Sequence, residues 1–136
     1  MTDPQPENAF STAVVEGTFD LAREGRTVPL GEMIDAGVPV DLRNPRGDTF
    51  LIVAAYAEHV ETVAELLRRG ADPDVVNSHG QTAVSCAVFR RNEPILRALL
   101  AAGADPDLGG MTAAQIADQF GLDGMRAVLE EHAAGR

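Results

Sequence analysis

Apolar residues recur along this chain in pairs of short blocks separated by brief polar breaks. One block is a nearly continuous apolar run over 50–57, and its partner over 60–67 has apolar residues at positions 60, 63, 66 and 67. This spacing places the apolar side chains of the second block on one stripe of a helix. A second pair of blocks, 83–89 and 95–100, has the same pattern. The pattern predicts a repeated unit of turn, short helix, short helix.

The unit recurs at a fixed period. The phrase Gly-Ala-Asp-Pro-Asp begins at Gly70 and again at Gly103, and a variant begins at Gly37, so that successive copies are 33 residues apart. The turn that follows is also repeated, but its third copy reaches Thr112 three residues early. A fixed period of this size indicates stacked repeats, which present an extended surface.

The predicted helix ends carry suitable residues. Each apolar run follows a threonine, Thr49, Thr82 or Thr112, whose hydroxyl is suited to accept a hydrogen bond from a free N–H at a helix start. Gly70 and Gly103 stand where a helix should stop, and glycine readily adopts the left-handed backbone needed there. These signals support the assignment of two short helices to each repeat.

Together these motifs resemble the ankyrin repeat. The resemblance rests on Gly80-x-Thr82-x-x-x-x-Ala87 and on Leu99-Leu100-x-x-Gly103-Ala104-Asp105. It implies an all-α ankyrin-repeat solenoid of about four stacked helix-turn-helix units with short hairpin-like turns between them. These units would form one domain, 9–136, after a mobile tail, 1–8, with boundaries at 9–46, 47–79, 80–109 and 110–132.

The chain departs from the family at one motif. Ankyrin repeats usually start the first helix with Thr-Pro-Leu-His, but here the histidine position holds Ile52, Ser85 and Gln115. The first unit also lacks its own entry turn, so its clearest match begins near residue 16. The hydrogen bonds that the family's histidine makes between repeats therefore have no direct counterpart in this sequence.

The charge balance limits the class of partner. The 136 residues carry a formal net charge of −10, and all eleven basic residues are arginine. Without a basic stripe to neutralise phosphates, nucleic acid and anionic membrane surfaces are not expected as partners. The negative charge favours solubility and, more weakly, a partner with a basic face. The acidic start has no apolar stretch, which predicts no signal peptide, no membrane span and a cytoplasmic location.

Candidate catalytic and metal-binding residues are few. Cys86, the single cysteine, lies inside an apolar run and is expected to be a small buried side chain. The aspartate pairs after Gly70 and Gly103 are expected to shape turns, because the proline between them locks the chain. His59 is expected to make a structural hydrogen bond, and the histidines lack metal-ligand spacing. We therefore predict no enzyme, no cofactor and no metal.

The resemblance implies where a partner would bind. In ankyrin proteins the concave face is built from the turn tips and the ends of the first helices, which here are Arg43, Arg46, Asp48, Tyr56, Val76, His79, Gln81, Phe89, Arg90, Gln119 and Phe120. Tyr56 and Phe89 are in register and should lie side by side, with Phe120 near the same row. Exposed aromatic side chains beside an arginine are typical binding hot spots. In the alternative interpretation, the two rings pack against the next helix and only seal the stack.

Two functions remain open on the sequence alone. The first is a non-catalytic, monomeric protein-protein interaction module that binds one protein partner on its concave face, with the groove fading at the shortened third turn. The second, based on the net charge, is a self-assembling or chaperone-like acidic protein that masks a basic region of a partner. Binding through the acidic surface would be strongly sensitive to salt, whereas binding through the aromatic groove would be weakly sensitive.

Overall fold

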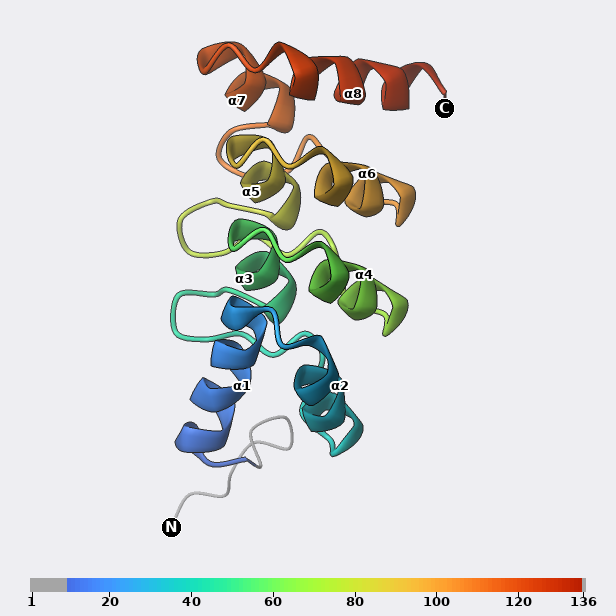
Figure 1. Ribbon diagram of the computed structural model, residues 1–136. Helices are drawn as coiled ribbons and strands as arrows, with labels where there is room; N and C mark the ends of the chain where they lie inside the picture. The colour runs from blue at the N-terminus through green and yellow to red at the C-terminus, as the bar shows by residue number, and fades with distance from the viewer. Residues whose placement is uncertain (1–9, 136) are drawn as a thin grey trace.

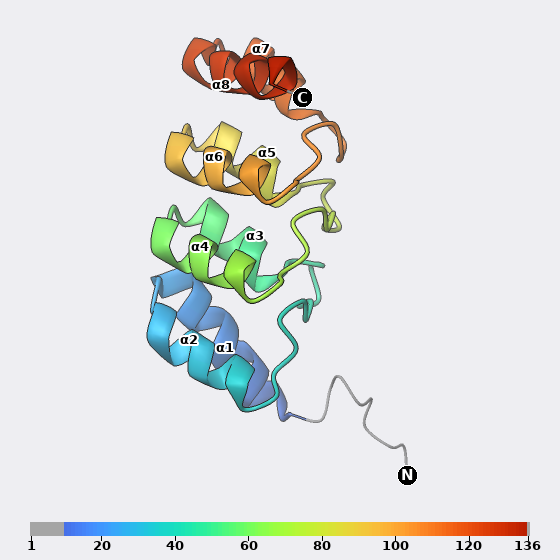
Figure 2. The ribbon, with the colours of Figure 1, turned by 90° about the vertical axis from the view of Figure 1, so that its right-hand side faces the viewer.

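The computed structural model describes residues 10–135, and the tail predicted over 1–8 lies outside this range. Within it, eight helices stack as four pairs (Figure 1). The helices are α1 (Thr12–Glu24), α2 (Thr27–Asp35), α3 (Phe50–Tyr56), α4 (Val60–Arg68), α5 (Ala83–Phe89), α6 (Glu93–Ala101), α7 (Ala113–Gln119) and α8 (Asp123–Ala134). First and second helices form two adjoining layers, and the loops between pairs project along one edge (Figure 2). The predicted all-α solenoid is confirmed.

Threonine caps begin the first helices of the last three pairs. The hydroxyl oxygens of Thr49, Thr82 and Thr112 each accept a hydrogen bond from the backbone N–H three residues later. Ser85 Oγ in turn accepts from Thr82 N, and Gln115 Oε1 accepts from Thr112 N, both at 2.8 Å. These reciprocal capping boxes stand where the ankyrin motif has histidine, and they satisfy N–H groups that a helix start otherwise leaves unpaired.

A left-handed residue follows the first helix at the equivalent point of every pair. Gly25, Glu58, Arg91 and Gly121 have φ angles of 72°, 67°, 59° and 65°. This change of backbone direction leads the chain into the second helix. Because it recurs at the same point in every pair, the two residues just before it occupy equivalent positions from pair to pair. Their side chains therefore form a row along the stack, beside the projecting loops.

The hydrophobic core runs the length of the stack between the two helix layers. Its fully buried side chains include Phe50 of α3, Leu66 of α4 and Leu99 of α6. The ring of Phe19 in α1 lies 4.4 Å from that of Phe50, centroid to centroid, and joins the first pair to the second. At 13 residues α1 is longer than α3, and it begins at Thr12, before the predicted match near residue 16. This core gives the loop edge a rigid support.

Arginine bridges tie the second-layer helices together. Arg69, which directly follows α4, donates to Asp35 of α2 and to Glu65 of α4, at 2.7 Å in each case. The hydrogen bond and the positive charge of Arg69 lower the pKa of Asp35 below its ordinary value. Such exposed pairs contribute little stability singly. No helix within residues 10–135 is both long enough and apolar enough to cross a membrane.

Candidate functional site

Asparagine side chains close the two complete loops on the projecting edge. We call 44–48 the first finger and 77–81 the second finger. Asn44 Oδ1 accepts from the N–H groups of Arg46 and Asp48, both at 3.0 Å. Asn77 Oδ1 accepts in the same way from His79 and Gln81, both at 2.9 Å. Each finger is thus held in one conformation by its own first residue.

The two fingers are also bonded to each other. Ser78 N donates to the carbonyl oxygen of Arg46 at 2.9 Å, and Asn77 Nδ2 donates to Asp48 Oδ1 at 2.7 Å. Asp48 is only 9% exposed. Asp48, predicted as a contact residue at a turn tip, is thus largely buried, because its carboxylate joins the fingers. The two fingers form a preformed edge, because hydrogen bonds within each finger and between the fingers hold the backbone in place.

The third loop, 108–111, is shortened and lies against the second finger. Gly110 N donates to the carbonyl oxygen of Gly80 at 2.9 Å. Gly109 has a φ of 100°, and a Cβ atom at this position would lie 2.6 Å from that same oxygen. Only glycine allows both the positive φ and the close approach. Because the loop is short, Met111 and Ile116 are left facing the concave side beside the second finger.

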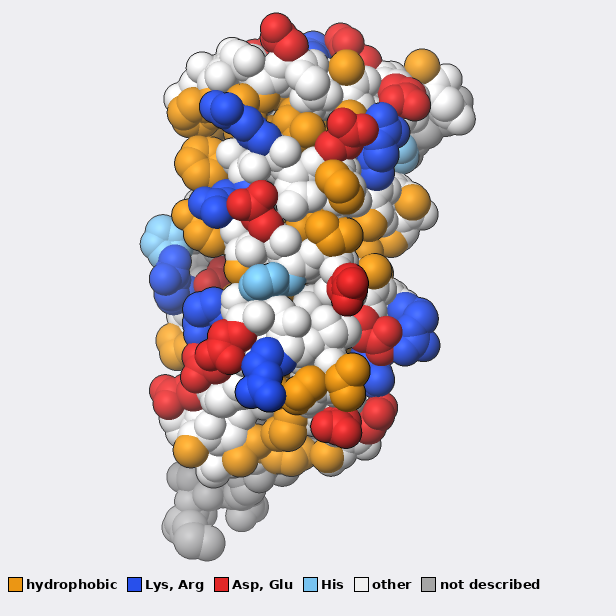
Figure 3. Space-filling model, viewed as in Figure 1, with side chains coloured by type: hydrophobic (Ala, Val, Ile, Leu, Met, Phe, Trp, Pro, Cys, Tyr) orange, Lys and Arg blue, Asp and Glu red, His pale blue; other side chains and the backbone are white. Residues whose placement is uncertain are grey.

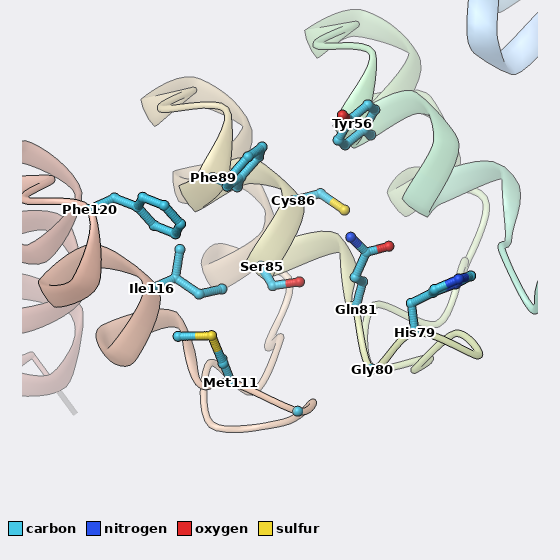
Figure 4. Close-up of a pocket in the computed structure, with 11 residues that line it drawn as sticks. Tyr56, His79, Gly80, Gln81, Ser85, Cys86, Phe89, Met111, Ile116 and Phe120 are labelled. Atoms are coloured by element: carbon cyan, nitrogen blue, oxygen red, sulfur yellow. The ribbon is translucent and has the colours of Figure 1, made fainter.

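The three aromatic side chains predicted for this face form one row (Figure 4). Tyr56, Phe89 and Phe120 are 47%, 49% and 49% exposed, so about half of the surface of each residue is open to solvent. The rings of Phe89 and Phe120 meet edge to face with 5.7 Å between their centroids. The guanidinium carbon of Arg90 lies 5.0 Å from the centre of the Tyr56 ring. The one-residue offset of Phe120 does not remove it from the row.

An apolar pocket of about 230 Å³ opens between the second finger, α5 and α7 (Figure 4). Its lining is mostly apolar and consists of Tyr56, Cys86, Phe89, Met111, Ile116 and Phe120, with His79, Gly80, Gln81, Ser85 and Gly110 at the polar side. The groove therefore does not fade at the shortened loop as expected. The missing residues uncover an apolar pocket there instead.

A second, larger hollow of about 630 Å³ lies between the first finger and the first-layer helices. We call it the arginine hollow, because Arg23, Arg46 and Arg90 line it together with a single carboxylate, Asp48. It shares Tyr56, Gln81 and Cys86 with the apolar pocket, so the two hollows adjoin. In the space-filling view, apolar side chains stand beside both basic and acidic side chains along the left-hand edge, where the loops project (Figure 3).

Most of the predicted contact residues line one or both of these hollows. Arg46, Asp48, Tyr56, Gln81 and Arg90 line the arginine hollow, while Tyr56, His79, Gln81, Phe89 and Phe120 line the apolar pocket. Arg43 lines a neighbouring hollow beside α1, and Val76 and Gln119 are exposed outside all of these linings. The sequence reasoning missed Ser85, Met111 and Ile116. The shortened third turn was the signal that could have found them.

The thiol between the hollows is not set up as a nucleophile. Cys86 is 3% exposed, and burial raises its pKa from 9.0 to about 12. The thiol is therefore neutral at physiological pH, and a neutral thiol is a poor nucleophile and metal ligand. Within residues 10–135, no three His, Cys, Asp or Glu side chains gather in an arrangement that could hold a metal ion.

The aspartates of the repeated turns and His59, which were candidate site residues, make structural hydrogen bonds. Asp74 N donates to Asp72 Oδ1 at 2.9 Å, and Asp105 N donates to Asp74 Oδ1 at 2.8 Å, so these aspartates shape and link successive turns. His59 Nε2 lies 2.8 Å from the carbonyl oxygen of Arg23 in the preceding repeat. These contacts account for the predicted turn and packing roles.

Comparison with known proteins identifies the repeats. The family model described as ankyrin repeats, in three copies, matches residues 19–110. An ankyrin repeat protein of Pseudomonas aeruginosa is 43% identical over 65 residues, which cover 46% of this chain and 38% of that protein. The human ankyrin repeat domain-containing protein 29 is 41% identical over 56 residues, which cover 40% of this chain and 19% of that protein. The matched segments thus span well under half of each relative.

Proposed function

The chain belongs to the ankyrin repeat family, and we propose that it is a non-catalytic module that binds one protein partner on its concave face. Ankyrin repeats are in general protein-protein interaction modules. The finer assignment concerns the surface used. We assign it to the fingers and the ends of α3, α5 and α7, which surround the apolar pocket and the arginine hollow.

The observation that supports this assignment is the half-exposed aromatic row. Tyr56, Phe89 and Phe120 are each close to 50% exposed and border a pocket with an apolar lining. Clustered apolar side chains on a surface are costly to leave in water and mark interaction sites. Aromatic and arginine side chains dominate the binding energy of most interfaces.

The hydrogen-bonded fingers beside the aromatic row also favour binding. Each finger is closed by its asparagine, and the fingers are bonded to each other. A surface that is already ordered loses little conformational entropy when a partner docks. The pocket offers no activated nucleophile, because its thiol is protonated and the Ser85 hydroxyl serves the cap of α5. These features suit binding and supply no chemistry for a reaction.

Affinity capture with matched variants tests the proposal. The full chain, a Tyr56→Ala/Phe89→Ala double variant and a Val28→Ala control are immobilised and exposed to lysate of the source organism. Val28 is 71% exposed on α2, so its removal deletes apolar surface away from the proposed face. Circular dichroism and thermal melting first establish that all three proteins fold.

The proposal expects a partner that the wild type and the Val28→Ala control retain at high salt and that the double variant loses. A partner that survives the double variant but washes off with salt would instead support recognition by the acidic surface. That result would overturn the assignment of the aromatic face.

A further inference from the structure

We propose that Gln81 donates a hydrogen bond to a backbone carbonyl of the partner, and that the recognised segment is extended and uncharged with one bulky apolar side chain. That side chain fills the apolar pocket beside Gln81. This inference rests on the proposed function and adds the chemistry of the recognised segment. It gives the net charge of −10 no part in recognition.

The second finger fixes the orientation of the Gln81 amide. Asn77 Oδ1 accepts from the backbone N–H groups of His79 and Gln81, so Asn77 Nδ2 lies on the other side of that amide. Asn77 Nδ2 donates to Gln81 Oε1 at 2.9 Å. An amide oxygen accepts and an amide nitrogen donates. The two backbone bonds therefore determine how both side-chain amides are oriented.

The amide nitrogen of Gln81 is directed at the junction of the two hollows. Gln81 lines both of them. Its Nε2 points toward Cys86 and Tyr56, while Oε1 is turned away from them (Figure 4). Within residues 10–135 this nitrogen has no hydrogen-bond acceptor, so its N–H groups are available to a partner. Because the side chain is already ordered, a bond from it costs little side-chain entropy.

The apolar pocket is suited to one side chain. At about 230 Å³ it is smaller than the roughly 300–1,000 Å³ typical of small-molecule sites. Phe89 and Phe120 form an edge-to-face wall, and Met111 and Ile116 supply aliphatic surface. A leucine, methionine or phenylalanine side chain from an extended partner segment matches this size and lining.

The charges around the Gln81 donor are balanced. Each arginine that lines the arginine hollow already pairs with a carboxylate. The pairs are Arg23 with Asp20, Arg46 with Asp48 and Arg90 with Glu58. Among the described residues, the lining of the apolar pocket includes no Asp, Glu, Lys or Arg. A charged partner residue would therefore lose water here without gaining an opposite charge, so an uncharged segment fits best.

An extended segment can make both contacts at once. Its residues are about 3.3–3.6 Å apart, so a residue that places its side chain in the pocket also brings a backbone carbonyl to the adjoining junction. Tyr56, Gln81 and Cys86 contribute to both linings, so no ridge of other residues separates the pocket from the junction. The amide donor thus fixes the position of the segment, and the pocket selects its side chain.

Selection from a displayed library of random linear peptides tests the inference. Peptides of about ten residues extend to about 33 Å, enough to follow the stack. The folded full chain serves as bait, and enriched peptides are sequenced. The inference expects a shared Leu, Ile, Met or Phe flanked by uncharged residues. Enrichment of acidic or basic peptides, or of none, would overturn it.

A variant that removes the donor but keeps its support sharpens the test. Gln81→Glu retains an oxygen that can accept from Asn77 and replaces Nε2 with a second acceptor. In fluorescence anisotropy we expect the best selected peptide to bind this variant about tenfold more weakly. Thermal unfolding should give nearly the same midpoint as for the wild type.

Gln119→Glu is the matched control. It makes the same chemical change at an exposed position outside both linings, and it should leave binding unchanged. If both variants weaken binding equally, the added charge is responsible and the role assigned to the Gln81 donor is wrong.

Backbone esters identify the acceptor. In copies of the peptide, one peptide bond at a time is replaced by an ester, whose carbonyl oxygen is a weaker acceptor. We expect one position to weaken binding to the wild type about fivefold and to have a smaller effect on Gln81→Glu. The N–H group that each ester also removes affects both proteins equally. If every ester has the same effect on both proteins, Gln81 does not donate to the backbone of the peptide.

The outcomes separate this inference from the proposed function. If Tyr56→Ala/Phe89→Ala abolishes binding but Gln81→Glu binds as tightly as the wild type, the face is correct and the inference is wrong. If the double variant binds as tightly as the wild type, both the face and the inference fail.

Discussion

The second finger and the shortened third loop occupy equivalent places in successive repeats but differ in how they are held. The second finger is closed by Asn77, whose side chain makes four hydrogen bonds, including one to the first finger. The third loop is held by a single backbone bond from Gly110 and by the close approach of Gly109 to Gly80. The second finger is stabilised by a network of side-chain hydrogen bonds. The third loop can lie against it because Gly109 carries no side chain.

This difference determines what each part of the face presents. Where complete fingers stand side by side, they present polar and charged tips, and the hollow between them and the helices is lined by arginine. Where the loop is short, the apolar side chains of α5 and α7 remain uncovered and form a pocket. A loss of three residues in one repeat thus changes the chemistry of the surface without changing the helix stack.

The largest expected effect concerns whether the core beneath the short loop is open to solvent. If the core is closed, Cys86 should react with iodoacetamide at pH 8 about a thousandfold more slowly in the folded protein than in denaturant. The reason is that the pKa of its thiol is raised from 9.0 to about 12 in the fold. Mass spectrometry of timed samples measures the rate. Rapid alkylation under native conditions would show that the pocket floor is open.

Removing the closure of the second finger should have the next largest effect. Asn77→Ala breaks four hydrogen bonds at a residue that is 6% exposed, and we expect a loss of about 3 kcal/mol in the free energy of unfolding. Asn44→Ala breaks only two bonds to backbone N–H and should cost about 1 kcal/mol. Urea unfolding measures both, and equal losses would contradict the ranking.

A side chain at the third loop tests the close approach. Gly109→Ala should lower the free energy of unfolding by about 2 kcal/mol, because the new Cβ meets Gly80 O and φ is positive. The control is Gly124→Ala within α8, where a Cβ meets nothing within 4 Å. There we expect a gain of about 0.5–1 kcal/mol from helix propensity. A neutral Gly109→Ala would mean that the loop moves freely away from the finger.

The smallest expected effects are the coupling free energies of two side-chain pairs, one at each hollow. Double-mutant cycles to alanine should give a coupling of about 0.5–1 kcal/mol for Phe89 with Phe120. Tyr56 with Arg90 should couple by about 0.5 kcal/mol, because the cation is partly exposed and also paired with Glu58. Thermal or urea unfolding of each set provides the values. Coupling near zero in both would indicate that the row does not act as a unit.

Much of the fold was predictable because its signals are local. The threonine caps at Thr49, Thr82 and Thr112 and the left-handed Gly70 and Gly103 all occur as expected. Each depends on a hydrogen bond or backbone preference within a few residues. Register likewise placed the aromatic row correctly, since the period carries equivalent positions to equivalent places.

The site was less predictable because it depends on contacts between repeats. Asp48 has the polarity of a surface residue, yet Asn77 from the next finger buries its carboxylate. Met111 and Ile116 resemble ordinary turn and helix residues, and only the position of the second finger shows that they line a pocket. Such features arise between residues about 30 positions apart, which no local pattern reports.

The sequence by itself determined the repeat period, the helix ends and the alignment of the aromatic row, because these follow from local backbone chemistry copied at a constant spacing. Only the tertiary structure decided which polar groups are buried between fingers and where the missing residues open a pocket. Those properties depend on how closely neighbouring loops approach. That approach is set by packing across the stack and by three glycines at the loop contacts, Gly47, Gly80 and Gly109, where a Cβ atom would meet the neighbouring loop.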